Sequence, residues 1–397
     1  MVINGMNQSN RSVMDSAVHN VRKLGKLDPA LYGAVILLNL MGLVSINSIA
    51  EVSGNSGILI KQTAGSVLGI LVMTVLCTIN YKRFSKYYKV LYGVVILSLA
   101  AVLFLGTSGG GARRWISIGG ITFQPSELAK ILLILFYSEF IINYIGQFSR
   151  LQVFALSTLL ILPPFFMILK EPDLSTSIMI ILIFCVILFI AGLNKKIIAG
   201  AAAAAIPSVM ILLYLVLSGS STFLGDYQRQ RILAWFHPED YASSTAYQTM
   251  NSMTAIGSGR LIGKGLSASS STLLGTGFIS ESQTDFIFAV IGEQFGFLGC
   301  SIMIVLITVI AVRCCIIASR SRDLSDKIVA CGMAAWIGLQ SYLNIGVATG
   351  LLPNTGIPLP FVSYGLTSLL CLYAGLGFVQ NICIRSKKAT SVHRHSK

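Results

Sequence analysis

Asp285 is the residue whose type and position most strongly suggest chemistry. It stands at the start of the apolar stretch TDFIFAVIGEQFGFLG, residues 284–299. A carboxylate there is costly inside a membrane and is therefore a functional-site hypothesis by default. At about 100° per residue, Gly292 and Gly296 share its helix face, and small residues let another helix approach. We expect Asp285 to face a helix bundle or a wet cavity, and any chemistry there to take place outside the cytoplasm.

Cations in two further segments could bind an anion such as a diphosphate. Arg113 and Arg114 precede Trp115 in GGGARRWISIGGITFQPSELAK. Guanidinium groups suit phosphate, although pairing with an acidic residue of another loop is an equal alternative, and Trp115 by itself suggests an interfacial anchor. Lys264 lies in AIGSGRLIGKG, a glycine-rich stretch that could cradle phosphate or be merely flexible.

The composition of the chain indicates a polytopic membrane protein. Its 397 residues are 54% hydrophobic and 11% charged, with a mean hydropathy of +0.77, whereas soluble domains carry about 25% charged residues. A net charge of +14 would suggest nucleic acid in a soluble protein. Because the basic residues sit in short loops between apolar runs, we expect contact with anionic lipid and no nucleic-acid partner.

Apolar runs of bilayer length predict an all-α fold of ten transmembrane helices. Most of the 29 basic residues fall on one side of this arrangement, which places both termini in the cytoplasm. The predicted domains are a cytoplasmic tail (1–30), a transmembrane domain (31–384) and a basic tail (385–397). The ten runs lie at 31–50, 57–79, 86–106, 127–146, 151–170, 174–193, 195–217, 285–312, 328–350 and 361–384.

The segments opposite the termini carry most of the unusual sequence. The loop between helices seven and eight, 218–284, is too long for an ordinary connection and is predicted to be functional. It contains YQRQRILAWF, residues 227–236, an amphipathic pattern suited to a membrane surface. The last such segment, LLPNTGIPLPFVSYG, is predicted to be a rigid re-entrant or loop structure because of its three prolines. Ser363 and Tyr364 would place hydroxyls at the same mouth.

Three acidic or basic residues have simpler structural interpretations as well. Asp173, in KEPDLST, is expected to cap the next helix, and the alternative is a second acidic group near Asp285. Glu127 and Lys130 follow Pro125 at a spacing of i, i+3 and could form a pair.

Several of these motifs occur together in one known family. RRWISIGGITFQPSELAK, EPDLST, YQ followed by AIGSG and GKG, TDFIFAVIGE and PLPFVSYG appear in the same order as in the SEDS family of shape, elongation, division and sporulation proteins. This group includes RodA and FtsW, and the wording of the motifs is more similar to RodA. The resemblance covers residues 31–384, with a similar ten-helix plan.

The resemblance implies a peptidoglycan glycosyltransferase in the cytoplasmic membrane of a bacterium. Such enzymes polymerise lipid II at the outer face of the membrane, beside a class B penicillin-binding protein and other proteins of the elongation or division complex. Their activity is linked to a divalent cation, Mg²⁺ or Mn²⁺. The family's essential Asp matches Asp285, which is thus the expected catalytic residue and metal ligand. The expected substrate-binding residues are Arg113, Arg114, Trp115, Gln124, Ser126, Glu127, Lys130, Asp173, Gln248, Lys264, Ser363 and Tyr364.

The chain departs from the usual family pattern at several of these motifs. Glu171 and Ser175 stand where relatives usually have the Gln and Gly of QPDLGT. The other departures are Gln283 before TDF, Gln294 in place of a second Glu, and Leu366 after SYG. Two other functions fit the same residues: a flippase for lipid-linked precursors, since broken helices and intramembrane charges suit transport, and a non-catalytic scaffold for cell-wall synthases.

Overall fold

The structure, a computed structural model, describes most of the transmembrane chain. The described residues are 25–109, 112–118, 121–147, 149–192, 226–243, 246–266, 273–275, 278 and 281–395, with single positions 200, 203, 207, 210 and 214. Their elements in chain order are α2 (Pro29–Ser53), α3 (Ser56–Thr78), α4 (Lys82–Ser85), α5 (Tyr88–Leu105), β1 (Thr107–Gly109), β2 (Ala112–Ile118), β3 (Ile121–Phe123), α6 (Pro125–Ile145), α7 (Arg150–Lys170), α8 (Leu174–Ile190), α10 (Asp226–Phe236), α11 (Tyr247–Ser258), α12 (Ile287–Arg320), α13 (Leu324–Ala348) and α14 (Leu366–His395).

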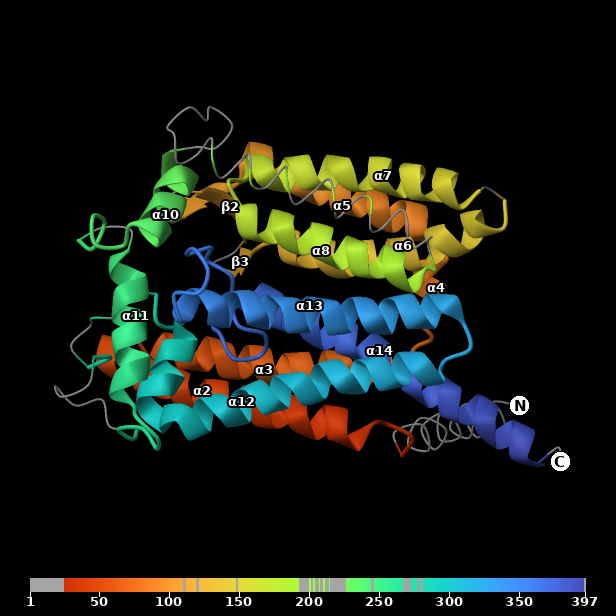
Figure 1. The fold of residues 1–397 in the computed structure, drawn as a ribbon. Coiled ribbons are helices and arrows are strands. Elements are labelled where there is room, and N and C mark those ends of the chain that lie inside the picture. The colour runs from red at the N-terminus through yellow and green to blue at the C-terminus, as the bar shows by residue number, and fades with distance from the viewer. Residues whose placement is uncertain are drawn as a thin grey trace, which may run out of the picture.

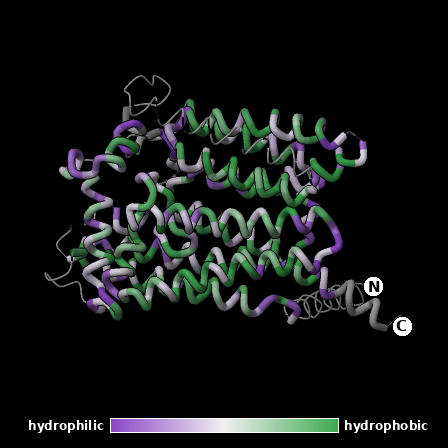
Figure 2. The backbone as a smooth tube through the Cα atoms, viewed as in Figure 1, coloured by the Kyte–Doolittle hydropathy of each residue, from purple (hydrophilic) through white to green (hydrophobic). Residues whose placement is uncertain are grey.

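The long helices form one bundle that is apolar along its length. Among the described residues, eight helices are long and apolar enough to cross a membrane, and α8 is a shorter apolar helix of 17 residues. These helices run along a common direction (Figure 1), and hydrophilic residues gather toward the ends of the bundle (Figure 2). The chain is therefore a helical multi-pass membrane protein, as predicted. Most of the seventh predicted span, 195–217, lies outside the described residues.

A small sheet interrupts the all-helical fold that we predicted. Strands β1, β2 and β3 form an antiparallel sheet in that order, with Ser108 opposite Arg113 and Ser117 opposite Thr122. The glycines on either side of RRWISI by themselves favour a loop. The aromatic Trp115 and the β-branched Ile116 and Ile118 favour strand pairing instead.

The two termini meet at one end of the bundle. The backbone N–H of Asp28 donates to Gln380 (2.9 Å), and Lys387 Nζ donates to the carbonyl of Lys26 (3.0 Å). The sheet, α10 and α11 lie at the opposite end (Figure 1), which we name the loop end. An even number of spans requires this arrangement. The cytoplasmic location of the termini stays a prediction.

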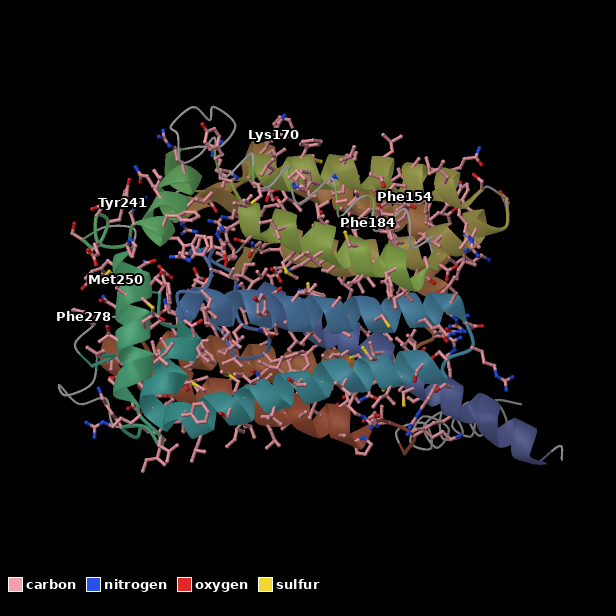
Figure 3. All side chains as sticks on the ribbon, in the orientation of Figure 1. Phe154, Lys170, Phe184, Tyr241, Met250 and Phe278 are labelled. Carbon is pink, nitrogen blue, oxygen red and sulfur yellow. The ribbon has the colours of Figure 1, made fainter. Side chains whose placement is uncertain are left out.

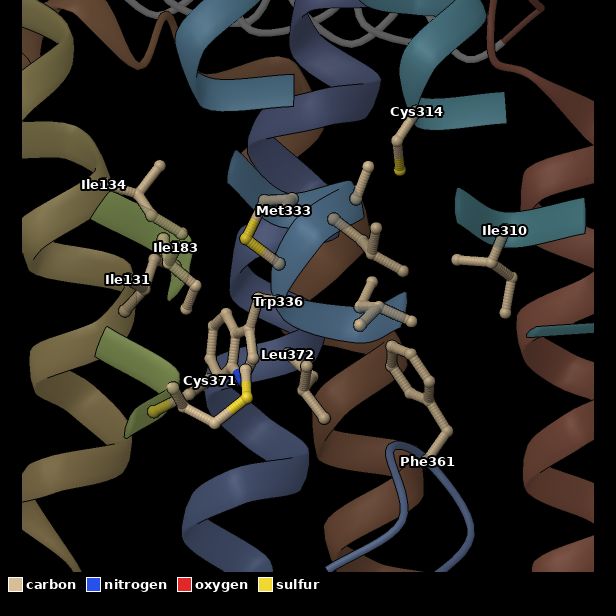
Figure 4. Close-up of a cluster of buried hydrophobic side chains, with 14 of the residues drawn as sticks. Ile131, Ile134, Ile183, Ile310, Cys314, Met333, Trp336, Phe361, Cys371 and Leu372 are labelled. Atoms are coloured by element: carbon tan, nitrogen blue, oxygen red, sulfur yellow. The ribbon is translucent and has the colours of Figure 1, made fainter. Parts of the chain in front are cut away.

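The segment 351–365, between α13 and α14, is re-entrant as predicted. It has no helix, so its backbone carbonyls need other partners inside the bundle. Buried amide side chains supply them: Asn39 donates to the carbonyl of Phe361 (3.0 Å), and Gln62 donates to that of Ser363 (3.0 Å). Phe361 itself reaches into the apolar core (Figure 4). Neighbouring helices therefore hold an irregular segment in one conformation.

The helix α12 is broken near its start, and the glycine-rich stretch 257–265 fills the break. Gly296 has non-helical backbone angles (φ 64°, ψ −160°). The N–H of Lys264 donates to the carbonyl of Glu293 (2.8 Å), and the N–H of Phe297 donates to the carbonyl of Arg260 (2.9 Å). The stretch is thus a packing element. A free phosphate cradle does not fit this arrangement, because the backbone N–H groups of Lys264 and Gly265 donate to carbonyls of α12; flexibility of the stretch stays a prediction.

Glycines make this close contact feasible. A methyl group on Gly259 would lie 1.9 Å from the carbonyl oxygen of Gly292, and one on Gly263 would lie 2.1 Å from that of Gln294. The small-residue face that we predicted on α12 is therefore real at Gly292 and Gly296. It receives α11 and the loop that follows α11.

Candidate active site

Asp285 lies in a turn, residues 281–286, immediately before α12. Our prediction that it begins the helix and shares a face with Gly292 was therefore wrong. The turn is fixed from two sides. Asn344 on α13 donates to the backbone carbonyl of Asp285 (2.8 Å), and Ser363 Oγ in the re-entrant segment donates to the carbonyl of Thr284 (2.6 Å).

Ser363 and Tyr364 position the Asp285 turn through hydrogen bonds. Ser363 Oγ also accepts a bond from the N–H of Leu359 (2.7 Å), so the buried hydroxyl both donates and accepts. The backbone N–H of Tyr364 donates to the carbonyl of Gln283 (2.8 Å). Contact of either hydroxyl with substrate stays a prediction.

The carboxylate group of Asp285 is half-buried. Within the part of the chain that the structure describes, no hydrogen bond or ion pair engages its oxygens. A methyl group on Gly356 would lie 3.2 Å from Asp285 Oδ2 and 3.7 Å from Arg231 Nη1, so the carboxylate and this guanidinium approach the same point. Burial raises the pKa of Asp285 to about 6, and the charge of Arg231 opposes that rise.

A second guanidinium and a second carboxylate lie beside this pair. Arg114 Nη1 is 3.9 Å from Asp173 Oδ1, and Gln124 Nε2 donates to Asp173 Oδ2 (3.4 Å). Asp173 also caps α8 by accepting from the N–H of Thr176 (3.0 Å), which confirms the capping prediction. Arg114 and Asp173 both act electrostatically on Asp285. Asp173 is therefore a cap and a member of the site at once.

Strand geometry separates the two adjacent arginines. Successive side chains of a strand point to opposite faces, and Arg113 is exposed whereas Arg114 is mostly buried. Trp115 is half-buried, and its carbonyl accepts a bond from Thr107 Oγ1 (3.1 Å). Of the two predicted phosphate ligands on this strand, Arg114 alone enters the Asp285 cluster.

Arg231, on α10, is a site residue that the sequence analysis missed. Arg231 Nη1 donates to the carbonyl of Asn354 (3.2 Å), and Asn354 Nδ2 donates to Gln248 Oε1 (3.0 Å), which places the predicted residue Gln248 at the same cluster. Trp235 Nε1 donates to the carbonyl of Gly350 (3.0 Å). One face of α10 therefore packs near the re-entrant segment, and the predicted location of α10 at the membrane surface stays a prediction.

A cleft joins these elements at the loop end. The side chain of Lys170, the last residue of α7, lies at the same end as Tyr241 and Met250, which are near α10 and α11 (Figure 3). Both arginines of the cluster line the cleft, so it is positively charged. Its lining residues are Arg114, Pro172, Leu174, Ser175, Arg231, Ile232, Pro353, Asn354 and Thr355.

Glu127 and Lys130 form the predicted pair, but behind the cleft. Lys130 Nζ lies 2.7 Å from Glu127 Oε1 and 2.8 Å from Gln340 Oε1, and Gln340 Nε2 donates to the carbonyl of Pro358 (2.8 Å). Both charged side chains are buried, as is Ser126. The expected direct contact with substrate does not fit this burial. The pair supports the re-entrant segment instead.

Lys264 also has a different environment from the one that we expected. Its Nζ lies 2.8 Å from Glu293 Oε1, and Glu293 also accepts bonds from the N–H groups of Leu273 (2.7 Å) and Leu274 (3.1 Å). No contact among the described residues joins Lys264 to Asp285. Its role as a substrate ligand stays a prediction that this arrangement does not support.

Comparison with known proteins places the chain in a family. Residues 29–388 match the FtsW, RodA and SpoVE family of cell cycle proteins. The chain belongs to this family. The peptidoglycan glycosyltransferase MrdB of Escherichia coli K12 is 34% identical over 357 residues, covering 90% of this chain and 93% of that protein. An FtsW protein of Geobacter sulfurreducens is 30% identical over 379 residues, covering 93% and 98%.

Solved structures agree with this assignment. A chain of a peptidoglycan synthase complex that coordinates polymerisation and crosslinking is similar with a TM-score of 0.75 and 27% identity, covering 91% of this chain and 98% of that one. The rod shape determining protein RodA of Thermus thermophilus is similar with a TM-score of 0.65 and 27% identity, covering 90% and 96%. The overall fold of this chain is therefore similar to that of both solved structures.

Proposed function

We infer that the protein is a peptidoglycan glycosyltransferase that polymerises lipid II at the outer face of the bacterial cytoplasmic membrane. The observation that carries this inference is the unengaged, half-buried carboxylate of Asp285 beside two guanidinium groups, those of Arg114 and Arg231. The activity named for the relatives is peptidoglycan glycosyltransfer. We propose the ten-helix plan of the family, with the loop end outside the cell.

The cluster contains the groups that this reaction needs. Asp285 accepts the proton of the acceptor's sugar hydroxyl, and the hydroxyl oxygen attacks the anomeric carbon of the lipid-linked donor. The bond from that carbon to the diphosphate breaks, and polyprenyl diphosphate leaves. Arg114 and Arg231 offset the charge of the leaving group. With a pKa of about 6, Asp285 is mostly ionised at neutral pH and is still basic enough to act.

As the alternative to direct proton transfer, we propose that Asp285 holds a divalent cation, Mg²⁺ or Mn²⁺, which would promote that transfer indirectly. Magnesium sites often use one or two carboxylates and complete their ligand shell with substrate phosphates and water, and the oxygens of Asp285 are free for this. The described residues contain no group of three His, Cys, Asp or Glu side chains arranged for a metal, so the substrate would supply the other ligands. A bound cation would neutralise diphosphate charge.

The decisive test is polymerisation of lipid II by the purified protein. We expect Asp285→Asn to lose about 100-fold or more of the rate, because a positioned general base contributes about that much. Asp240→Asn is the matched control, since Asp240 is exposed at the loop end after α10. Equal rates for the two variants would refute the role of Asp285.

The same preparations separate the alternative functions. A flippase would move labelled lipid II across sealed vesicles without forming polymer. A scaffold would sustain cell-wall synthesis in cells carrying Asp285→Asn. We propose a class B penicillin-binding protein as partner, because a related chain belongs to a complex that couples polymerisation to crosslinking. Other elongation or division proteins would join it, and co-purification from membranes tests both.

A further inference from the structure

Glu171 is a fully buried carboxyl group that the mechanism above does not use. It follows α7 directly, and its backbone N–H bonds the carbonyls of Met167 and Ile168. Its side chain is 0% exposed, and neither carboxyl oxygen has a hydrogen-bond partner among the described residues. A buried carboxylate without a partner is very costly. The group is therefore either neutral or paired in another state of the protein.

The charged neighbours of Glu171 belong to the candidate site. Asp173 in the same link and Arg114 on β2 are the charged groups that act on it. Arg114 Nε is itself buried and has no hydrogen-bond partner in the described structure. The residues on either side of Asp173, Pro172 and Leu174, line the cleft together with Arg114. Glu171 is thus a buried neighbour of the cleft lining, next in sequence to Pro172 and within the electrostatic influence of Arg114.

Charges farther out belong to the Asp285 cluster. Arg231 and Glu281 act on Asp285, as do Arg114 and Asp173. Burial and, to a smaller extent, the charge of Asp173 raise the pKa of Glu171 to about 8, and the charge of Arg114 opposes the rise. A diphosphate bound at Arg114 would add negative charge and favour the neutral acid still more.

We propose that Glu171 is a positioning residue for the donor diphosphate. As a neutral acid, Glu171 leaves Arg114 free to bind phosphate. As a carboxylate, Glu171 competes with phosphate for the guanidinium of Arg114. This inference rests on the proposed function. When the donor binds to protein whose Glu171 is ionised, one carboxyl oxygen takes one proton from solvent and forms one O–H bond. No bond of the substrate changes in that step.

The kinetic test compares the KM for lipid II at pH 7 and pH 9. If the donor requires neutral Glu171, a pKa of about 8 makes the KM of the unchanged protein rise by about tenfold over this range. Glu171→Gln keeps a neutral side chain of nearly the same shape, so its KM should stay level and its kcat at pH 7 should stay normal. The control Glu51→Gln removes an exposed carboxylate at the loop end and should retain the tenfold rise.

Two results would overturn the proposal: a KM for Glu171→Gln that rises as in the unchanged protein, or loss of its activity at pH 7 with normal thermal stability. The second would mean that Glu171 works as an anion. If the unchanged protein polymerises lipid II and Asp285→Asn does not, either result leaves the proposed function intact.

A measurement on the unchanged protein needs no variant. Calorimetry in two buffers of different ionisation enthalpy measures the protons taken up when polyprenyl diphosphate binds. The protein should take up about 0.9 proton per molecule bound at pH 9 and about 0.1 at pH 7. Equal uptake at the two pH values would contradict the proposal.

Discussion

Gly356 controls the space between the candidate base and its guanidinium neighbour. It adopts φ +71°, in the left-handed region, and a methyl group there would lie 3.2 Å from Asp285 Oδ2 and 3.7 Å from Arg231 Nη1. Replacing Gly356 with alanine therefore makes two changes. It strains the backbone of the re-entrant segment, and it pushes the carboxylate away from its present position.

The two effects have different sizes and different readouts. Left-handed backbone costs a residue with a Cβ atom about 1–2 kcal/mol, which lowers thermal stability. A carbon–oxygen contact of 3.2 Å requires the neighbour to move by a few tenths of an ångström. A misplacement of about 1 Å can reduce a rate by about 100-fold, so we expect Gly356→Ala to lower kcat by about tenfold.

Gly54 provides a matched control for backbone strain. It ends α2 at φ +63°, and a methyl group there would meet no heavy atom within 4 Å. Gly54→Ala should lose similar stability and keep its kcat. The assay is polymerisation of lipid II at saturating substrate, alongside a thermal melt of each protein. If the two variants have the same kcat, the methyl group does not disturb the base, and our geometric reasoning is refuted.

Three further predictions concern charge. First, kcat/KM should fall about tenfold per pH unit below a pH of about 6, because Asp285 must be ionised to accept a proton and its pKa is raised to that value; a rate that stays level down to pH 4.5 would contradict this. Second, Arg231→Gln should raise the KM for lipid II by about tenfold or more, since a charge-assisted bond contributes about 1.5–3 kcal/mol. The control is Arg260→Gln, which changes an exposed arginine at the same end. Equal KM values for the two variants would count against the site. Third, Lys130→Met should destabilise the protein by about 3–5 kcal/mol in denaturant melts, because Glu127 stays buried without its partner. The double variant Glu127→Gln, Lys130→Met should recover part of that lost stability. No recovery would show that the broken pair is not the cause of the destabilisation.

Local sequence determined the membrane character of this protein and much of its plan. Apolar runs of bilayer length predict helices because every backbone polar group in lipid needs a partner within its own segment. The short-range spacings also held: Glu127 pairs with Lys130 at i, i+3, and Asp173 caps α8. The motifs around Asp285 are specific enough for the amino-acid sequence alone to indicate the family.

Tertiary structure alone decided which charges share a site. Arg113 and Arg114 look equivalent in the sequence, but the strand β2 points only Arg114 toward Asp285. The sequence did not predict this strand, because the glycines on either side of β2 favour a loop. Lys264 pairs with Glu293 because a glycine-rich loop fills the break in α12. The cation beside the Asp285 carboxylate is Arg231 instead. Proximity between distant segments and the burial of Glu171 depend on how helices and loops pack in three dimensions. Periodicity and residue type describe one segment at a time, so they carry no information about that packing.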